Sequence, residues 1–356
     1  MCPMTSLERV RAAVNLKEPD VVPVGPYMGN HGAKVGGALI SNYCTNGKVM
    51  AAAQLKAWEI YQQDIIVAQS DNYYIAEGFG ITVDMHEDST PTLREPVVHE
   101  LKDVYKLKVH DPYKDGRMPV YLEAIDLIKK QVGGQVAIRG TGTGPFSLAS
   151  HLMGTQRFLE ELAMASIEPE GEAARALRHL LELTSDALIA FARAQVDAGA
   201  DIVQAGDSLA SIDVISPRMY QEWAWPYEKK FFDALNNYAH DRKVMTLLHV
   251  CGNVTPVLPL MAATGAMILE LDYKVDLAVA KASVGDRVCL MGNLNPAELL
   301  LRGTAADVAA ESQRCIDAAG KGGGFILGSG CELAYYTPQE NVHAMIRVAR
   351  ENRYPL

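Results

Sequence analysis

The chain has 356 residues, of which 49% are hydrophobic and 21% charged, and its formal net charge is −10. The acidic balance and the lack of a Lys/Arg cluster argue against a nucleic-acid surface, and without a run of about 18 apolar residues we expect no transmembrane helix and no membrane partner. The six cysteines are scattered and the N-terminus lacks the pattern of a signal peptide, so we expect a cytoplasmic protein with reduced cysteines.

The N-terminal part of the chain predicts a helix, a short strand and a polar loop. The helix is expected over residues 6–14. The strand is expected over residues 20–26, and it ends at Gly25 and Pro26. The loop that follows is rich in glycine and contains Tyr27, Asn30 and His31. Long loops are uncommon in compact domains unless they cover a functional site. We therefore expect these three side chains to bind a substrate.

Two further segments lead to the middle of the chain. A helix over residues 51–63 and a buried strand over residues 64–67 precede a polar, aromatic stretch that contains Tyr73. Because this stretch directly follows a strand, Tyr73 is a fourth candidate for substrate binding. Residues 81–118 contain many prolines and charged side chains, which predicts an insertion with short hairpin strands.

From residue 119 onward, helices alternate with short apolar strands. The expected helices cover residues 120–131, 170–198 and 217–237, and the expected strands cover residues 136–139, 201–205, 244–249, 267–271, 288–291 and 325–327. Strands of this kind are typical of sheets that helices cover on both faces. The segments around Val22 and Ile65 bring the number of strands to eight. The sequence thus predicts an α/β fold, a (β/α)8 TIM barrel with an N-terminal extension and a short insertion, as one domain over residues 1–356.

Three residues at predicted strand ends have side chains that bind zinc. His249 and Cys251 are two positions apart in an extended segment, so both side chains lie on the same side of it. Cys331 follows the last predicted strand, and strand ends converge on one face of a barrel. A set of two cysteines and one histidine leaves a fourth position open, as in catalytic zinc sites. The alternative is that these residues are ordinary members of the core.

Two carboxylates are candidates for catalytic roles at the same face. Asp207 follows a predicted strand and is expected to point over the barrel mouth, where it would orient the substrate; the alternative is a cap for the turn that follows it. Glu332 is adjacent to Cys331. It is expected to support a metal ligand or to serve as a displaceable fourth ligand.

Several motifs of the C-terminal third resemble one known family. They are His249-Val-Cys-Gly-Asn253, Met291-Gly-Asn-Leu-Asn-Pro296, Gly330-Cys-Glu332 and Thr337-Pro-Gln-Glu-Asn341. With these motifs the chain resembles the uroporphyrinogen decarboxylase superfamily, and in particular its zinc-dependent corrinoid methyltransferase branch. The resemblance implies a (β/α)8 barrel, a Zn2+ ion on the two cysteines and the histidine, and a corrinoid (cobalamin) carried by a separate partner protein.

One departure from the decarboxylases bears on the reaction. Uroporphyrinogen decarboxylases are metal-free and hold the substrate carboxylates with an arginine-rich segment near the N-terminus. The equivalent loop of this chain, residues 24–32, contains no arginine. The resemblance therefore favours methyl transfer over decarboxylation of a porphyrinogen.

Two directions of methyl transfer fit the resemblance. We favour transfer from a small donor, an aryl methyl ether, to the cobalt of the corrinoid protein. The spacing of Asp213, Glu228 and His249 is similar to the acid–acid–histidine pattern of O-demethylases, with Asp in place of the first Glu, and the tyrosine-rich loops suit an aromatic donor. The alternative is transfer from methyl-corrinoid to a thiol similar to coenzyme M or to a folate. A decarboxylase and a non-catalytic scaffold for a corrinoid protein are the less favoured hypotheses.

Overall fold

The computed structural model describes residues 3–355, except for the side chains of residues 239 and 240. Its α-helices are α1 (Ser6–Val14), α2 (Asn30–Val35), α3 (Ile40–Tyr43), α4 (Gly47–Tyr61), α5 (Met118–Val132), α6 (Pro145–Met153), α7 (Thr155–Ile167), α8 (Glu172–Ala198), α9 (Pro217–Met219), α10 (Trp225–Ala239), α11 (Leu258–Ala262), α12 (Leu277–Val284), α13 (Ala305–Ala319) and α14 (Gln339–Glu351). The 3₁₀ and π turns are η1 (Ala76–Phe79), η2 (Leu101–Lys106), η3 (Ser208–Ala210), η4 (Tyr220–Ala224), η5 (His240–Arg242), η6 (Thr255–Val257) and η7 (Pro296–Leu301). The strands are β1 (Ile65–Ala68), β2 (Thr82–Asp84), β3 (Thr92–Glu95), β4 (Ala137–Gly140), β5 (Ile202–Gly206), β6 (Met245–Val250), β7 (Ile268–Leu271), β8 (Cys289–Leu294) and β9 (Phe325–Ser329).

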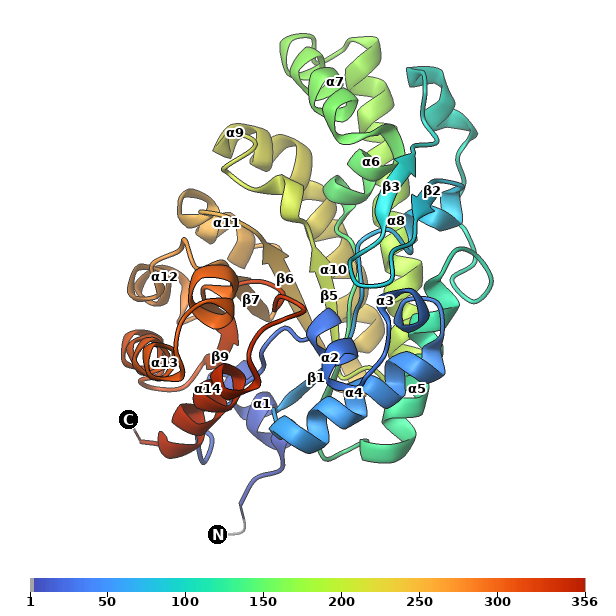
Figure 1. Cartoon of the computed structure of the whole chain (residues 1–356). Helices are drawn as coiled ribbons and strands as arrows, with labels where there is room; N and C mark the ends of the chain where they lie inside the picture. The colour runs from blue at the N-terminus through green and yellow to red at the C-terminus, as the bar shows by residue number, and fades with distance from the viewer. Residues whose placement is uncertain (1–2, 356) are drawn as a thin grey trace.

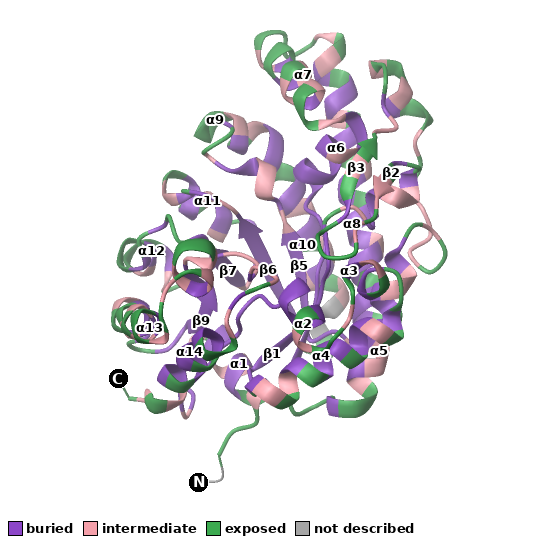
Figure 2. Ribbon diagram, viewed as in Figure 1, coloured by how far each residue is buried: buried purple, intermediate pink, exposed green. Residues whose placement is uncertain are grey.

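Seven parallel strands form the central sheet in the order β1-β4-β5-β6-β7-β8-β9. They curl into a barrel with the helices on the outside (Figure 1). The strands are almost entirely buried, and exposed residues lie on the outer faces of the helices (Figure 2). The prediction of a TIM-barrel fold is confirmed, and each predicted strand from residue 136 onward lies within one or two residues of its observed start.

The expected first strand, residues 20–26, is reduced to a short connection between β9 and β1. Val24 forms a single parallel bridge to Leu327, whose N–H donates to the carbonyl of Pro23 at 2.8 Å. On the other side, Asp64 N–H donates to the carbonyl of Val24 at 2.8 Å. The prediction of a full strand here is wrong because Pro23 and Pro26 have no N–H to donate to a ladder.

The interior of the barrel is layered. Because side chains alternate along a strand, every second residue points inward. The lower layer is apolar and includes Ile65, Ala137, Ile202, Leu247, Ile268, Met291 and Ile326, with Leu7 and Val10 of α1 packed into the same cluster. Two positions further along four of these strands, the buried residues are polar: Arg139, Gln204, His249 and Glu270. The carboxyl half of the barrel is therefore polar inside, and this is where the candidate site lies.

The insertion predicted over residues 81–118 contains the antiparallel hairpin of β2 and β3 and the turn η2. Arg94 pairs with Asp84 across the hairpin at the surface, whereas Arg117 is buried and pairs with Asp71 at 2.7 Å. Among the described residues, no helix is both long enough and apolar enough to cross a membrane.

Candidate metal centre

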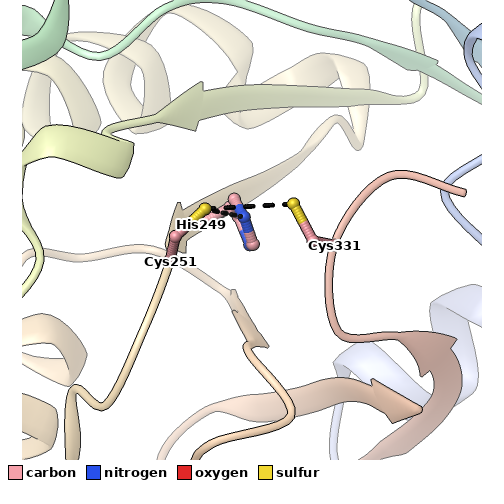
Figure 3. Close-up of side chains that lie close together, drawn as sticks. All are labelled: His249, Cys251 and Cys331. Carbon is pink, nitrogen blue, oxygen red and sulfur yellow. Dashed lines mark hydrogen bonds between the residues drawn. The ribbon is translucent and has the colours of Figure 1, made fainter. Parts of the chain in front are cut away.

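Three side chains at the carboxyl ends of β6 and β9 converge on one point (Figure 3). One donor atom from each of His249, Cys251 and Cys331 lies within 4.8 Å of the other two. The Nε2 atom of His249 is 3.2 Å from the Sγ of Cys251, and the two Sγ atoms are 3.9 Å apart. In the described part of the chain, no other group of three such side chains meets this distance.

The spacing of these atoms fits a zinc ion. Two thiolates bound to one tetrahedral zinc at about 2.3 Å each lie about 3.8 Å apart, and a thiolate and an imidazole nitrogen lie about 3.5 Å apart. The observed separations of 3.9 Å and 3.2 Å are close to both values. Two cysteines and one histidine would hold such an ion and leave a fourth position open.

The imidazole of His249 is oriented from behind by Glu270 on the neighbouring strand β7. Its Nδ1 lies 3.2 Å from the backbone carbonyl oxygen and 3.3 Å from Oε2 of Glu270. A proton on Nδ1 is therefore satisfied, and Nε2 faces the cysteines. A carboxylate behind a ligating histidine is a common support in metal sites.

The carboxylate of Glu270 is itself held by a buried arginine. Arg139 donates two hydrogen bonds of 2.7 Å to the two carboxylate oxygens of Glu270 and one of 2.8 Å to Gln204. Its guanidinium also lies 4.3 Å from the centre of the Tyr27 ring. Arg139 is 1% exposed and Glu270 is not exposed. Because a buried charge without a partner is strongly destabilising, each of the two side chains depends on the other for charge compensation. This network fixes the position of His249.

The two cysteines differ in their surroundings. The hydrogen bond between the thiols lowers the pKa of Cys251, as do His249 and the Ser208 hydroxyl, whose oxygen lies 3.2 Å from Sγ. The same hydrogen bond raises the pKa of Cys331. Burial opposes a charge on His249, but the neighbouring Cys251 outweighs it and raises the pKa of the imidazole to about 9. The cluster therefore favours one thiolate, the species that binds a metal.

A cavity of about 60 Å3 opens directly onto this cluster and is lined by His249, Cys331 and Glu332 together with Tyr27, Gln69, Asn72, Tyr74, Thr141, Gly142, Gln204, Gly206 and Ser208. Glu332 accepts a hydrogen bond of 2.8 Å from the backbone N–H of Asn30. Desolvation raises the pKa of Glu332 to about 7. An acid of this kind beside an open metal position can take up or release a proton near neutral pH.

The four predicted substrate-binding residues have different surroundings. Tyr27 lines the cavity, and its backbone N–H donates to Ser329 at 3.0 Å. Asn30 and His31 are buried behind it: Asn30 donates to the carbonyl of Ser70, and His31 lies 2.9 Å from the hydroxyl of Tyr61. Tyr73 packs against His151 with ring centres 4.7 Å apart. Direct substrate contact is compatible with the position of Tyr27, and for the other three it stays a prediction.

Asp207 is fully buried and lies outside the cavity lining. Its carboxylate accepts hydrogen bonds from the backbone N–H groups of Ser147 at 2.6 Å and Phe146 at 3.1 Å, in the first turn of α6. Burial raises the pKa of Asp207 to about 6, against the opposing effect of these bonds. The observed contacts make it a cap of α6, while its expected role in orienting the substrate stays a prediction.

The acid–acid–histidine pattern is not assembled around His249. Asp213 is exposed at the surface and forms an ion pair of 2.6 Å with Lys274. Glu228 is buried on α10 and accepts a hydrogen bond of 2.5 Å from the hydroxyl of Tyr220. Neither belongs to the metal-ligating group of the described residues.

A substitution of Glu228 tests whether this residue contributes to folding stability or to metal binding. Burial raises its pKa well above the usual value, so the folded state holds a proton that the unfolded state releases above about pH 4.5. Stability should therefore fall as pH rises from 4.5. In Glu228→Gln the side-chain amide still accepts the hydrogen bond from Tyr220. Because the amide does not ionise, the loss of stability with rising pH no longer occurs. We expect a higher urea midpoint than that of the wild type at pH 8, a small difference at pH 4.5, and an unchanged zinc content. A reduced zinc content would contradict the assignment.

Reasoning from the sequence missed the residues that support the ligands: Arg139, Gln204, Glu270 and Ser208. A signal was present for two of them. Arg139 and Glu270 are charged residues in the middle of short apolar strands, and a charge in such a place needs a buried partner. The pairing itself was hidden, because the two residues are 131 positions apart.

Comparisons with known proteins found similar sequences and a similar solved structure. The family model of uroporphyrinogen decarboxylase (URO-D) matches residues 5–352. The chain is similar to the methylcobamide:CoM methyltransferase MtbA of Methanosarcina acetivorans, with 34% identity over 74% of this chain and 72% of that protein. It is also similar to the uroporphyrinogen decarboxylase of Cellvibrio japonicus, with 29% identity over 99% of this chain and 98% of that protein. A solved structure of a methyltransferase from Methanosarcina mazei matches with a TM-score of 0.87 at 29% identity and covers 98% of this chain and 99% of that one.

Proposed function

Because the chain belongs to the uroporphyrinogen decarboxylase family, we propose that it is a zinc-dependent methyltransferase that moves a methyl group from the cobalt of a corrinoid to a small thiol. The observation that carries this proposal is the group of His249, Cys251 and Cys331, which faces a cavity at the barrel mouth with no fourth side chain of the described residues in the set. Because the cavity is far too small for a corrinoid, a separate corrinoid protein would present the cobalt from outside.

In this proposal the residues of the chain prepare the thiol. Bound to the three ligands, zinc would supply Lewis acidity that keeps a substrate thiol in its thiolate form. Glu270 and Arg139 hold His249 in the orientation that ligation needs, and Ser208 supports the Sγ of Cys251. Glu332 lines the same cavity and would accept the proton that the thiol loses. The thiolate sulfur would then attack the methyl carbon, whose bonding electrons return to the cobalt.

Glu332→Gln tests the proton acceptor. The amide keeps an oxygen for the N–H of Asn30 but cannot take up a proton. We expect kcat to fall by about 10²- to 10⁴-fold, the range of general acid–base contributions, while one zinc per chain is retained. Stopped-flow absorbance of methyl-cobalamin measures the rate. A kcat within twofold of the wild-type value would exclude Glu332 as the proton acceptor.

Transfer in the opposite direction, from an aryl methyl ether to cobalt, is the second candidate. The rings of Tyr27 and Tyr74 line the cavity, and the open metal position could polarise an ether oxygen. Against it, Asp213 and Glu228 do not approach His249 as an acid–acid–histidine site requires. The similarity to proteins named methylcobamide:CoM methyltransferases also favours a thiol.

One assay separates these functions. The zinc-loaded chain is mixed with methyl-cobalamin and a series of thiols, and separately with reduced cobalamin and a series of aryl methyl ethers. Loss of methyl-cobalamin with a thiol supports the first proposal, and its formation from an ether supports the second. Zinc binding without either reaction, also when a corrinoid protein is supplied, would indicate a non-catalytic scaffold. Release of carbon dioxide from a porphyrinogen by the metal-free chain would indicate a decarboxylase.

A further inference from the structure

An amide group with a fixed orientation borders the cavity of the metal ligands. Gln204 is a buried, inward-pointing residue of β5 that lines this cavity. Its Oε1 accepts a hydrogen bond of 2.8 Å from Nε of Arg139. Because a guanidinium has no acceptor atom, the oxygen of the amide must face Arg139 and the nitrogen must face away from it. This leaves Nε2, whose protons no group of the described residues accepts, as a donor.

Gly206 keeps the space beside this nitrogen open. It is the next inward position of β5, lines the same cavity and pairs in register with His249. A Cβ atom on Gly206 would lie 2.8 Å from Nε2 of Gln204, which is closer than such atoms approach. The φ angle of Gly206 is not in the left-handed region, so the backbone conformation does not require glycine here. The missing side chain instead leaves Nε2 open toward the cavity, on the strand next to His249.

A second donor, the hydroxyl of Tyr27, belongs to the same cavity. The ring of Tyr27 lies edge-on to that of His249, with ring centres 6.5 Å apart, and the guanidinium of Arg139 lies 4.3 Å from its centre. In the part of the chain that the structure describes, no group forms a hydrogen bond with the hydroxyl, and a phenol keeps its proton at neutral pH. Arg139 thus contacts both Tyr27 and Gln204, which brings the two donors to the same part of the cavity.

We propose that Gln204 and Tyr27 determine substrate specificity by donating hydrogen bonds to one oxygen of the small substrate. The inference rests on the proposed function, because the sulfur of the same molecule would lie at the metal ligands. The cavity of about 60 Å3 holds about four atoms of the size of a water oxygen, so the acceptor oxygen must be close to the sulfur. The substrate class is therefore a short thiol with a carbonyl oxygen on the carbon next to the one that carries the sulfur.

The charges around the cavity favour an uncharged carbonyl over an anion. All residues that line the cavity are described, and they include no lysine and no arginine. The charge of Arg139 is already compensated by Glu270, which it binds through two hydrogen bonds of 2.7 Å. Glu332 lines the same cavity, and its carboxylate would repel a carboxylate or a sulfonate of the substrate. An uncharged amide or ketone has the acceptor oxygen without this repulsion.

The test measures thiol binding without any corrinoid. Calorimetry on the zinc-loaded chain compares 2-mercaptoacetamide with 2-methylpropane-1-thiol, which has the same shape without the polar atoms, and with mercaptoacetate. We expect the wild type to bind the amide most tightly, because the thiol without oxygen leaves both buried donors unpaired.

Two substitutions remove one donor each and keep the shape of the side chain. In Tyr27→Phe the ratio of the affinities for the amide and the alkyl thiol should fall by about 2- to 10-fold, the effect of one neutral hydrogen bond. Gln204→Glu keeps an oxygen for Arg139 but replaces the donor by an acceptor, so the ratio should fall by at least about tenfold. Gln156→Glu, the same change on the exposed face of α7, is the matched control and should keep the ratio. All three variants should retain one zinc per chain.

A ratio that stays at the wild-type value in either Tyr27→Phe or Gln204→Glu would overturn the donor pair, and so would tightest binding of mercaptoacetate or of the alkyl thiol by the wild type. If no thiol binds, the proposed thiol substrate fails, and the donor pair is tested separately with acetamide, which has the carbonyl but no sulfur. In that case the side-chain amide signal of Gln204 in a 15N–1H NMR spectrum should shift with acetamide, and the shift should be weaker in Tyr27→Phe. A signal that acetamide leaves unchanged would refute the donor pair itself.

Discussion

Cys331→Ala is expected to remove stoichiometric zinc from the protein and to lower methyl transfer by at least about a thousandfold. With His249 and Cys251 alone, two ligands remain where a catalytic zinc needs three. The loss should be specific to this cysteine, because Cys331 is the one candidate ligand that follows β9 and closes the site across the barrel mouth. Metal analysis of protein purified without chelators gives the zinc content, and the absorbance of methyl-cobalamin gives the rate.

Cys315→Ala is the matched control for this experiment. Cys315 is buried on α13, and its Sγ lies 3.7 Å from the side-chain oxygen of Asn293 rather than near the metal ligands. This variant should keep one zinc per chain and most of the activity, although it loses some stability through its smaller side chain. Equal zinc contents in the two variants would contradict the assignment of Cys331, and so would full activity of Cys331→Ala.

Arg139→Met is expected to destabilise the protein by about 3–5 kcal/mol, because it leaves the carboxylate of Glu270 buried without its partner. The two residues are paired through both carboxylate oxygens at 2.7 Å, and neither is exposed by more than 1%. Zinc affinity should also fall by about 10- to 100-fold, since Glu270 no longer holds His249 in place. Urea unfolding of the metal-free protein measures the first effect, and competition with a chelator measures the second.

The double variant Arg139→Met/Glu270→Met separates these two effects. Removing both charges should recover most of the lost stability, as for other buried ion pairs replaced by apolar side chains. It should not recover zinc affinity, because the support behind Nδ1 of His249 is then absent. If Arg139→Met were as stable as the wild type, or if the double variant bound zinc normally, the network would have no role in positioning the ligand.

The prediction from the sequence was most accurate where local signals repeat. Each short apolar strand after residue 119 was placed within a few residues, since a buried parallel strand bounded by helices leaves a clear pattern. The three residues that could hold a metal ion were identified for a similar reason. Cys251 directly follows β6, two positions after His249, and the convergence of strand ends in a barrel placed Cys331 beside them.

Other features depend on which side chains meet across the fold. Asp207 ends a strand as predicted, yet its carboxylate binds the N-terminus of α6, which the sequence places about 60 residues earlier. Asp213 and Glu228 have the spacing of an acid–acid–histidine pattern, but spacing does not determine direction: one side chain pairs with Lys274 at the surface and the other with Tyr220 in the core. Residues 20–26 were expected to form a strand, and the prolines within them limit the pairing to two isolated bridges, of Val21 to Arg353 and of Val24 to Leu327.

The sequence by itself therefore determined the barrel, the family and the three residues that can hold a metal, because periodicity, motif and strand-end position are properties of short segments. Only the tertiary structure decided what surrounds those three residues. The Arg139–Glu270 pair behind His249 and the cavity at the metal ligands both join segments that are far apart in the chain. In a barrel each inward side chain meets partners from other strands, so the charge, the hydrogen bonds and the free volume at the mouth follow from closure of the sheet and not from any one segment.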